Sequence, residues 1–600
     1  MVSAPAIIVL GPSGLGTGNA VAEAVEGKLH GLIRRVSETD VAFDDTIAHL
    51  QQLFSAGTPI IGICAAGILI RALGPLTGDK RAEPPVLAVS EDGASVVPLL
   101  GGHHGANALA QRIAEGLDAH AAITTAGDVS FGVALDAPPV GWTLANPEAA
   151  KPAMAALLAG QSARLSGHAP WLQGSGMRMS PDGTVEITIT EKTVAAHEGQ
   201  LVYHPTTLAL GVGCERGCEP QELINLVEET LARNTLAPAA LACVASIDVK
   251  ADEAAVHTLA AHLGVPTRFF SAEELNKEAP RLANPSDLVL AEVGCPGVAE
   301  GAALAMAGEN GALTVEKTKS KRATCALALA PAPIRPDDHG RARGHLSVVG
   351  LGPGTPHWRS PEATDLLSRA SDWVGYGLYL DLAADLAAGK AEHRYDLGAE
   401  EIRVRAALAL AAEGKDVALI CSGDAGIYAM ASLVFEVMAE PGDPALRRIE
   451  VTVAPGISAF QAAAARAGAP IGHDFCTISL SDLLTPWEVI EQRLHAAAEG
   501  DFVVAFYNPK SQRRTDQIVR AMAILGAHRP PSTPMIIASN LGRPEEHVRV
   551  RALSEFDPDE VDMLTLVMVG SSETKTLKTG DGAVWTYTPR GYAKKREAAE

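Results

Sequence analysis

The chain has 600 residues, of which 47% are hydrophobic and only 4% aromatic, and its formal net charge is -22. This length exceeds what one hydrophobic core supports, so we expect several domains of ordinary size. The negative charge disfavours nonspecific binding to nucleic acid or to an anionic membrane, because both require a positive field. Any anionic ligand must therefore be bound by local arginine or lysine side chains.

The eight cysteines are scattered along the chain. The closest pair, Cys214 and Cys218, has no second pair nearby to complete a metal site, so we predict reduced thiols, no metal and a cytoplasmic location. Residues 1–11 lack a basic region before their apolar stretch and are predicted to form a strand, not a signal peptide. The most apolar segment, 59–70, contains two glycines and is too short to cross a membrane.

The first part of the chain alternates short apolar strands with helical patterns, which is typical of α/β domains with parallel sheets. The predicted strands are 6–10, 59–64, 86–90 and 121–126, and the predicted helices are 19–25 and 106–116. Residues 1–137 are therefore predicted to form a first α/β domain.

A small middle domain is predicted over residues 138–206, with a helix at 149–160 and a hairpin at 179–190 whose turn is Asp182-Gly183. The α/β pattern resumes over residues 207–330. Its predicted elements are strands at 208–214, 241–247, 288–294 and 323–330 and a helix that begins near Glu219. Residues 331–344 combine proline, glycine and charge, which predicts a linker.

Downstream of this linker, residues 345–575 are predicted to form a further α/β domain with two lobes, followed by a C-terminal tail at 576–600. Ser360 followed by Pro361 is typical of a helix start. The predicted strands are 346–350, 373–375, 416–421, 449–453, 502–506, 535–539 and 564–569, and the predicted helices are 361–370, 425–438, 458–467 and 515–525. The whole chain is thus predicted to be a multidomain α/β protein.

The loop after the strand at 346–350 contains Gly350, Gly352 and Gly354, spaced two residues apart. This spacing does not meet the G-x-G-x-x-G pattern of a dinucleotide site. Residues 11–19 lack the Gly-Lys-Ser/Thr of a P-loop. A turn without Cβ atoms lets a ligand approach the main chain, but a plain tight turn explains one such loop equally well.

Three further loops of this kind follow later strands: CSGDAGIY (421–428), APGISAF (454–460) and FYNPKSQRR (506–514). Loops at the ends of strands in α/β sheets converge on one site. Together with GLGPG, YGLYLD (376–381) and ISLSDLLTPW (478–487), these loops resemble the precorrin-3B C17-methyltransferases of the tetrapyrrole methylase family.

This resemblance covers about residues 344–572 and implies the two-lobed fold of class III methyltransferases. It implies that S-adenosylmethionine lies between the lobes, that S-adenosylhomocysteine is a product, and that the protein is a homodimer through this domain. Methyl transfer itself requires mainly alignment and exclusion of water. The residues implied to bind the donor are Gly352, Pro353, Gly354, Gly423, Asp424, Ala425, Ile427, Tyr428, Ser458, Ala459, Tyr507, Asn540 and Thr565.

The resemblance also implies contraction of the macrocycle, which requires proton transfer. The candidates for this step are Asp474, Ser481, Asp482, Tyr507 and Lys510, and a structural role explains each of them equally well alone. A polycarboxylate substrate requires local positive charge. The available cations are Arg359, Arg394, Arg403, Arg405, Lys510, Arg513 and Arg514. We expect Lys510, Arg513 and Arg514 to bind the substrate, and the others to be solvated surface cations.

In the first half, GGHHGANALAQ (101–111) places glycines and two adjacent histidines at a strand-to-helix turn. Adjacent histidines point apart, so joint metal binding is not expected, and a helix-capping turn is the simplest interpretation. Together with the segments at 59–75, 211–218 and 294–308, however, this turn resembles the cobalt-precorrin-5A hydrolases, over about residues 6–330.

Those hydrolases open a lactone on the macrocycle and release a two-carbon aldehyde. The step needs a base that activates water, for which His103 and His104 are candidates, and oxyanion donors, for which the amides of Gly101, Gly102 and Gly105 are candidates. Further candidates are Glu215, Arg216, Glu300 and Lys317. A tetrapyrrole-binding module without catalysis explains the glycine-rich turns equally well.

The two resemblances together predict a bifunctional enzyme of cobalamin biosynthesis. Its C-terminal half would methylate C17 of precorrin-3B, or of its cobalt form, and contract the ring to precorrin-4. Its N-terminal half would hydrolyse a lactone and release acetaldehyde. The alternative is another tetrapyrrole methylase fused to a scaffold that binds tetrapyrroles without turning them over.

Overall fold

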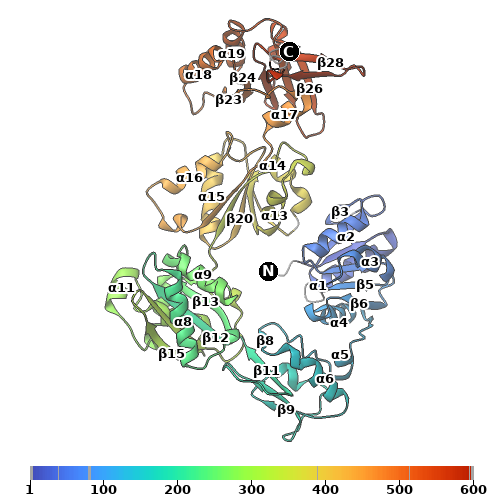
Figure 1. Cartoon of the computed structure of the whole chain (residues 1–600), viewed down its shortest axis with the longest axis vertical. Helices are drawn as coiled ribbons and strands as arrows, with labels where there is room; N and C mark the ends of the chain where they lie inside the picture. The colour runs from blue at the N-terminus through green and yellow to red at the C-terminus, as the bar shows by residue number, and fades with distance from the viewer. Residues whose placement is uncertain are drawn as a thin grey trace. The chain divides into compact units, whose positions relative to one another are not determined.

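The computed structural model describes residues 4–37, 39–78, 83–387, 389–511, 514–592 and 595. The chain divides into two compact units, Met1–Arg343 (unit 1) and Gly344–Glu600 (unit 2), shown in Figure 1. The division falls at the end of the predicted linker. Part of that linker belongs to unit 1, because the backbones of Phe269 and Arg341 exchange hydrogen bonds of 2.8 and 2.9 Å.

Unit 1 begins with a sheet of strand order β3-β2-β1-β4-β5-β6-β7, in which β5 and β6 are antiparallel and the other neighbours parallel. Its strands are β1 (Ala6–Val9), β2 (Lys28–Leu32), β3 (Val41–Phe43), β4 (Ile60–Ile63), β5 (Val86–Val89), β6 (Ser95–Leu100) and β7 (His120–Ala121), and its helices are α1 (Leu15–Val25), α2 (Thr46–Ser55), α3 (Ala66–Leu73) and α4 (Ala106–Leu117). α1 and α4 cover one face, and α2 and α3 the other. The strand predicted at 121–126 is wrong beyond Ala121, where β7 ends, and α5 (Ala126–Phe131) begins at the last residue of the predicted range.

The middle part of unit 1 has the strand order β8-β11-β10-β9. Its elements are β8 (Trp142–Leu144), α6 (Ala150–Leu158), β9 (Ala163–Ser166), α7 (Pro170–Gln173), β10 (Val185–Ile189) and β11 (Gln200–Pro205). The hairpin predicted at 179–190 is wrong, although its turn forms, with Gly183 N donating to Ser180 O at 3.0 Å. β10 and Met179 both pair in parallel with β9, because Gly183 brings the turn against the backbone of Ala163, where a Cβ would lie 2.4 Å away.

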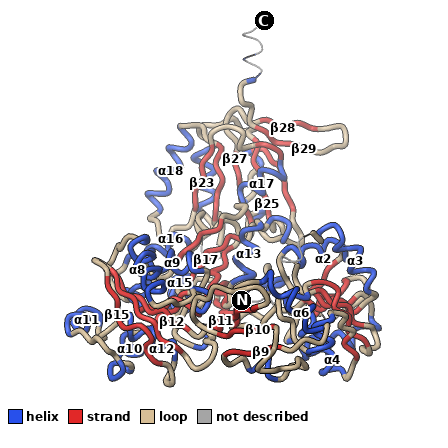
Figure 2. The backbone as a smooth tube through the Cα atoms, turned by 60° about the horizontal axis from the view of Figure 1, so that its bottom comes forward, coloured by secondary structure: helices blue, strands red, loops and turns tan. Residues whose placement is uncertain are grey.

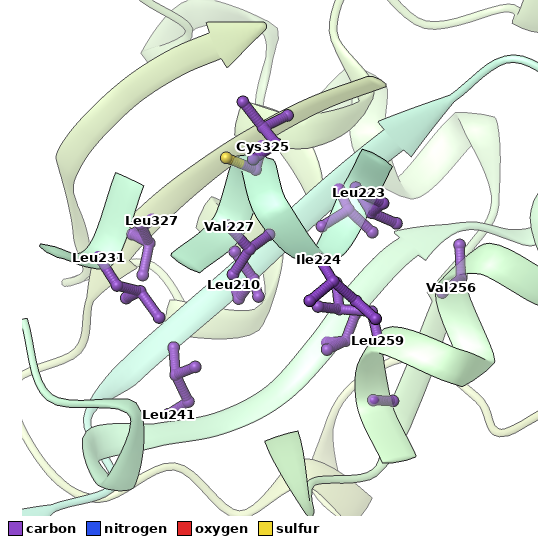
Figure 3. Close-up of a cluster of buried hydrophobic side chains, with 14 of the residues drawn as sticks. Leu210, Leu223, Ile224, Val227, Leu231, Leu241, Val256, Leu259, Cys325 and Leu327 are labelled. Carbon is purple, nitrogen blue, oxygen red and sulfur yellow. The ribbon is translucent and has the colours of Figure 1, made fainter. Parts of the chain in front are cut away.

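The last part of unit 1 has the strand order β14-β13-β12-β16-β15. Its elements are β12 (Leu208–Cys214), α8 (Pro220–Arg233), β13 (Leu241–Ile247), α9 (Ala254–Leu263), β14 (Thr267–Phe270), α10 (Ala272–Lys277), α11 (Asp287–Val293), α12 (Val298–Ala307), β15 (Ala312–Lys319) and β16 (Ala323–Leu329). α8 and α9 form one side of the core, where Figure 3 shows Val227 over Leu210. α12 covers the other face so closely that a Cβ on Gly211 would lie 1.9 Å from Ala299 O.

The strand predicted at 288–294 is wrong, because these residues form α11. The Ser286 hydroxyl accepts a hydrogen bond from Val289 N and caps the helix start, and Gly294 ends the helix at a φ of 79°. Local capping therefore outweighs the apolar run. Among the described residues, no single helix is both long and apolar enough to span a membrane, and α11 and α12 meet those criteria only as a bent pair.

Unit 2 begins with a lobe whose parallel sheet has the order β19-β18-β20-β17-β21. Its elements are β17 (His345–Gly350), α13 (Pro361–Arg369), β18 (Asp372–Tyr376), α14 (Gly377–Asp381), β19 (Ala391–Tyr395), α15 (Glu400–Ala412), β20 (Asp416–Cys421), α16 (Ala431–Ala439) and β21 (Glu450–Ala454). α15 and α16 cover one face and α13 and α14 the other (Figure 1). The helix predicted from residue 425 begins only at Ala431, so 423–430 remain a loop.

The second lobe of unit 2 has the strand order β23-β24-β27-β25-β26. Its elements are α17 (Ala459–Ala467), β23 (Phe475–Ser479), α18 (Trp487–Glu499), β24 (Val503–Tyr507), α19 (Gln517–Gly526), β25 (Pro534–Ser539), β26 (His547–Ala552) and β27 (Thr565–Val569). Figure 2 shows β23 and β27 of this sheet between α18 and α17. α18 and α19 pack on one face, and α17 packs on the other.

The segment predicted as a C-terminal tail contains regular structure. β28 (Lys575–Lys578) and β29 (Val584–Tyr587) form a hairpin, and β29 also pairs with β22 (Gly468–Ala469) directly after α17. The buried hydroxyls of Thr574 and Thr588, which stand at the two ends of the hairpin, lie 2.8 Å apart and connect these ends. The hairpin is therefore a part of the second lobe.

The stability of unit 1 should depend on pH through His30. This residue is 7% exposed, and its Nδ1 lies 2.8 Å from His49 Nε2. Burial, followed by the charges of His49 and Lys28, lowers the pKa of His30 to about 4. The unfolded chain binds this proton near pH 6.5, whereas the folded chain binds it only near pH 4. The free energy of unfolding is therefore highest above pH 6.5 and falls as the pH decreases toward 4, by at most about 3 kcal/mol.

Urea unfolding of the full chain between pH 7.5 and 4.5 measures this effect. We expect His30→Leu to flatten the dependence of the midpoint on pH. The control His262→Leu alters a half-exposed histidine of the same unit, paired with Glu228, and should keep the wild-type slope. Equal slopes for all three proteins would contradict the assignment.

Candidate functional site

Three loops at the carboxyl ends of β17, β20 and β21 contact each other through their main chains. Gly352 and Gly423 exchange backbone hydrogen bonds of 3.1 and 2.8 Å. A Cβ on Gly456 would lie 2.1 Å from Gly423 O, and a Cβ on Gly350 would lie 2.7 Å from the same oxygen. Gly352 also has a φ of 78°, and its Cβ would lie 2.7 Å from Trp358 O. The glycines therefore allow the loops to meet at backbone distance.

The Asp424 side chain holds two of these loops together. Its Oδ1 accepts a hydrogen bond from Gly426 N at 2.8 Å, and its Oδ2 accepts one from Gly456 N at 3.1 Å. Both oxygens are thus engaged by the main chain. This explains why 423–430 form a loop where the sequence predicts a helix, since the carboxylate stabilises a turn.

A cavity of about 290 Å³ lies beside these loops, between the two lobes of unit 2. Many of the residues predicted to bind the donor line it: Pro353, Gly423, Asp424, Ile427, Tyr428, Ala459, Tyr507, Asn540 and Thr565. The others lie behind this wall. Gly352 pairs with Gly423, Ala425 is buried, and Ser458 forms a capping box with Gln461 at the start of α17. Gly354 packs against Gly542 O of the second lobe.

Side chains from each lobe reach the other beside the cavity. The Tyr428 hydroxyl donates to Thr477 O of β23 at 2.9 Å. Arg543 of the second lobe donates through Nε to Pro353 O and through Nη2 to Ser422 Oγ, both at 3.3 Å. The sequence analysis did not identify Arg543. Its position directly after Gly542 in another glycine-containing turn at a strand end was the available signal.

Three residues other than glycine that line this cavity have a left-handed backbone conformation. Tyr428, Asn508 and Asn540 line it and have φ values of 51°, 49° and 52°. Residues other than glycine adopt this left-handed region at an energetic cost, and such residues cluster at binding sites. The loops are thus held in a shape that their sequence does not favour locally.

Only Tyr507 among the acid–base candidates lies on the cavity wall. Its hydroxyl oxygen accepts a hydrogen bond from Phe460 N at 3.3 Å. Burial raises the pKa of Tyr507, so the phenol stays protonated at neutral pH and can donate a hydrogen bond, but cannot act as a base. Asp474 is exposed and pairs with His473 at 3.3 Å, and Asp482 accepts a hydrogen bond from Gln517.

The predicted substrate-binding cations belong to the loop after β24. Arg514 donates to Ser481 Oγ at 3.2 Å and to Asn508 O at 3.0 Å, and Lys510 donates to Pro558 O at 2.7 Å. Arg514 and Lys510 therefore hold loops next to the cavity, and they do not line it. Arg513 lies outside the described residues.

The remaining arginines separate into two kinds. As expected, Arg394 and Arg405 are half-exposed surface cations, and they pair with Asp381 and Glu392 and with Glu401 and Glu440, respectively. The expectation of a surface cation is wrong for Arg359, whose side chain is 6% exposed and pairs with Asp385. It is also wrong for Arg403, which is 3% exposed and lines the cavity. The signal for its burial was its helical spacing, because Arg403, Ala407 and Ala411 follow one another at intervals of four on the buried face of α15.

In unit 1, the turn that carries the two histidines caps α4. Gly101 and Gly105 have φ values of 72° and 91°, and His104 N and Ala106 N both donate to Gly101 O. The side chain of His103 lies outside what the structure describes. Glu300 is buried and accepts hydrogen bonds from Ala283 N, Asn284 N and Lys317 N, each at 2.9 Å, so it holds the loop before α11 against β15.

The two other polar candidates of unit 1 form ion pairs. Glu215 pairs with Arg322 at 2.9 Å, and Arg216 pairs with Asp252 at 2.6 Å. The structure does not gather them with His104 in a described cavity. Their roles, and those of the histidines, stay predictions.

The part of the chain that contains the cavity matches a known protein family. The family of tetrapyrrole (corrin/porphyrin) methylases matches residues 345–557. A precorrin-3B C(17)-methyltransferase of Sinorhizobium sp is 42% identical over 253 residues, which cover 42% of this chain and 98% of that protein. The chain belongs to the tetrapyrrole methylase family. The resemblance predicted for unit 2 is therefore confirmed, as is the multidomain α/β fold.

Unit 1 also matches known families. The N-terminal family of cobalamin synthesis protein G matches residues 48–128, and its C-terminal family matches residues 208–328. The predicted fusion of this kind of protein with a tetrapyrrole methylase is thus confirmed.

Two further proteins are each similar to a part of the chain about as long as unit 2. A cobalt-factor III methyltransferase of Priestia megaterium is 44% identical over 253 residues, 42% of this chain, and the chain spans 46% of the length of that relative. A crystal structure of the methyltransferase CobJ is 42% identical, with a TM-score of 0.38, and its similarity covers 41% of this chain and 100% of that one.

The contact between loops should make Gly456→Ala destabilising. Its Cβ would meet Gly423 O, a backbone atom that cannot move without shifting the loop after β20. We expect a loss of at least about 2 kcal/mol in the unfolding free energy of unit 2. Gly442→Ala is the matched control, since nothing lies within 4 Å of its Cβ. Denaturant unfolding of the full chain checks this, and equal midpoints for the two variants would contradict it.

Proposed function

We propose that the cavity of unit 2 binds S-adenosylmethionine. The residues present fit such a ligand, because apolar and aromatic residues line one cavity together with Asn540 and Thr565, and Arg403 on its wall has hydrogen-bond donors without partners among the described residues. Ile427, Tyr428 and Tyr507 would hold the donor, with the main chain at Pro353 and Gly423. When bound, the sulfonium supplies an electrophilic methyl group.

The proposed reaction is methylation of C17 of precorrin-3B, or of its cobalt form, with contraction of the ring to precorrin-4. The observation that carries this proposal is the lobe-spanning cavity within a unit that is 42% identical to a precorrin-3B C(17)-methyltransferase over 98% of that protein. The protein's own residues align the reactants and exclude water, with Leu541, Met563 and Leu564 supplying apolar surface. Tyr507, which stays protonated, would donate a hydrogen bond to an oxygen of the contracting macrocycle.

This assignment predicts the effect of Tyr507→Phe. The full chain, supplied with methyl-labelled donor and precorrin-3B, should form a labelled, contracted product. Tyr507→Phe should lower formation of that product roughly 100-fold, because the hydrogen bond to the macrocycle oxygen is lost, and should change donor affinity only a few-fold. Tyr587→Phe, on the exposed hairpin, should behave as the wild type. Absence of labelled product from the wild type with either form of the macrocycle would refute the proposed function.

For unit 1 we propose hydrolysis of a macrocycle lactone with release of acetaldehyde. The support is the match to both families of cobalamin synthesis protein G and the glycine turn at 101–105, in which the left-handed residues Gly101 and Gly105 flank the histidines. In this proposal His103 or His104 activates the water. The second candidate is a scaffold without turnover, favoured by the observation that the turn already serves as the cap of α4.

Aldehyde release separates these two possibilities. The full chain incubated with the lactone-bearing cobalt-precorrin-5A should release acetaldehyde, measured by coupled reduction. His103→Ala or His104→Ala should reduce the rate roughly 100-fold. His120→Ala, an exposed histidine on β7, should not. Binding of the macrocycle without aldehyde would establish the scaffold.

We also propose a cytoplasmic location and a homodimer formed through unit 2. The free cysteines support the first, since Cys64, Cys214, Cys218, Cys243, Cys295, Cys325, Cys421 and Cys476 are all unpaired. The family resemblance supports the second. The partner of the site is a tetrapyrrole polycarboxylate, and the net charge of -22 argues against nucleic acid or an anionic membrane as partners.

A further inference from the structure

Arg403 is buried in the cavity wall with unused hydrogen-bond donors. It is 3% exposed, and its Nε and Nη1 have no hydrogen-bond partner among the described residues. Its Nη2 lies 3.3 Å from Glu400 Oε1, whose side chain is 47% exposed. A buried guanidinium is unfavourable unless acceptors surround it, so the unfilled donors mark a place where an acceptor from outside the protein is needed.

Of the acidic side chains on the cavity wall, Glu400 pairs with Arg403, and it does so through Nη2. Burial raises the pKa of Tyr379 and raises that of Cys421 to about 11, so both side chains are neutral beside the guanidinium. The acidic residues on the cavity wall are Glu400 and Asp424. Both Asp424 oxygens already accept main-chain hydrogen bonds, and Glu400 accepts one from Gly398 N at 3.3 Å. Among the described residues Glu400 thus pairs with Nη2, and no acceptor is bonded to Nε or Nη1. A ligand in the cavity can supply a further acceptor for the guanidinium.

We propose that Arg403 is a carboxylate receptor of the cavity. Its planar fork matches the two oxygens of a carboxylate, which can accept parallel hydrogen bonds from two of its nitrogens. Arg543, on the opposite lobe, is a second cation on this wall. The inference rests on the proposed function and adds to it a group that selects acidic ligands.

Two ligands of the proposed reaction carry this chemistry. The donor has an amino-acid carboxylate, and the macrocycle has carboxylates on its side chains. Both would satisfy the same fork, and binding measurements distinguish them. S-adenosylhomocysteine keeps the carboxylate of the donor, whereas 5′-methylthioadenosine has the same nucleoside without the amino-acid part.

The experiment uses the full chain with Arg403→Met, which keeps the volume and removes the fork, and Arg403→Lys, which keeps the charge. Arg405→Met is the matched control, because Arg405 lies on the same helix but is half-exposed and paired with Glu401 and Glu440. Calorimetric titration measures the affinity for each nucleoside, and steady-state kinetics measures the KM for the macrocycle.

If Arg403 binds the donor carboxylate, Arg403→Met should weaken S-adenosylhomocysteine roughly 10- to 100-fold and leave 5′-methylthioadenosine within threefold of wild type. If it binds the macrocycle, both nucleosides should be unaffected, and the KM should rise by a similar factor. Arg403→Lys should recover only part of the loss, since an ammonium lacks the fork. Arg405→Met should change none of these values.

Thermal unfolding without ligand separates binding from a purely structural role. Since Arg403→Met removes an incompletely paired buried charge, its midpoint should equal or exceed that of the wild type. A lower midpoint, with both affinities and the KM within threefold of wild type, would overturn the inference. A wild-type protein that bound neither nucleoside would overturn the proposed function, and the inference with it.

Discussion

The site of unit 2 depends on one steric constraint, which is that the backbones at Gly350 and Gly456 approach the carbonyl of Gly423 too closely for a Cβ atom. Gly350 ends one strand of a parallel sheet, Gly423 and Gly456 follow two others, and a Cβ on Gly350 or Gly456 would lie 2.7 or 2.1 Å from Gly423 O. Asp424 adds hydrogen bonds to two of these loops. We call the contacting loops after β17, β20 and β21 the floor of the cavity. From this floor Tyr428 extends to the second lobe, where its hydroxyl donates a hydrogen bond. The cavity between the lobes exists because these loop backbones pack so closely against each other.

The sequence predicted most of this arrangement because its signals are local. Apolar runs placed the central strands within a residue or two, and the loops 421–428, 454–460 and 506–514 do gather at strand ends. The errors have physical causes. Residues 288–294 are apolar like a strand but carry helix caps at Ser286 and Gly294, and the turn at Gly183 directs both of its arms onto β9.

Tertiary packing decided what the sequence pattern left open. Arg403 was expected to be a solvated cation, yet it lies on the buried face of α15. Lys510 and Arg514 were expected to bind the substrate; they donate hydrogen bonds to neighbouring loops, and their role toward a substrate stays a prediction. A charged side chain gives no local indication of whether it is buried, since that depends on which helix face meets the sheet. In an acidic chain the consequence is large, because two arginines, Arg403 and Arg543, supply the positive charge on the cavity wall.

The left-handed backbone at Tyr428, Asn508 and Asn540 has a consequence for protein engineering. The shape of the cavity floor comes from main-chain geometry that glycines and strained residues maintain together. The side walls are formed by ordinary side chains such as Leu541 and Met563. To accept a differently substituted macrocycle, a designer can therefore vary the wall side chains in combinatorial libraries and keep the floor unchanged. Reshaping the acceptor pocket then need not weaken binding of the cosubstrate.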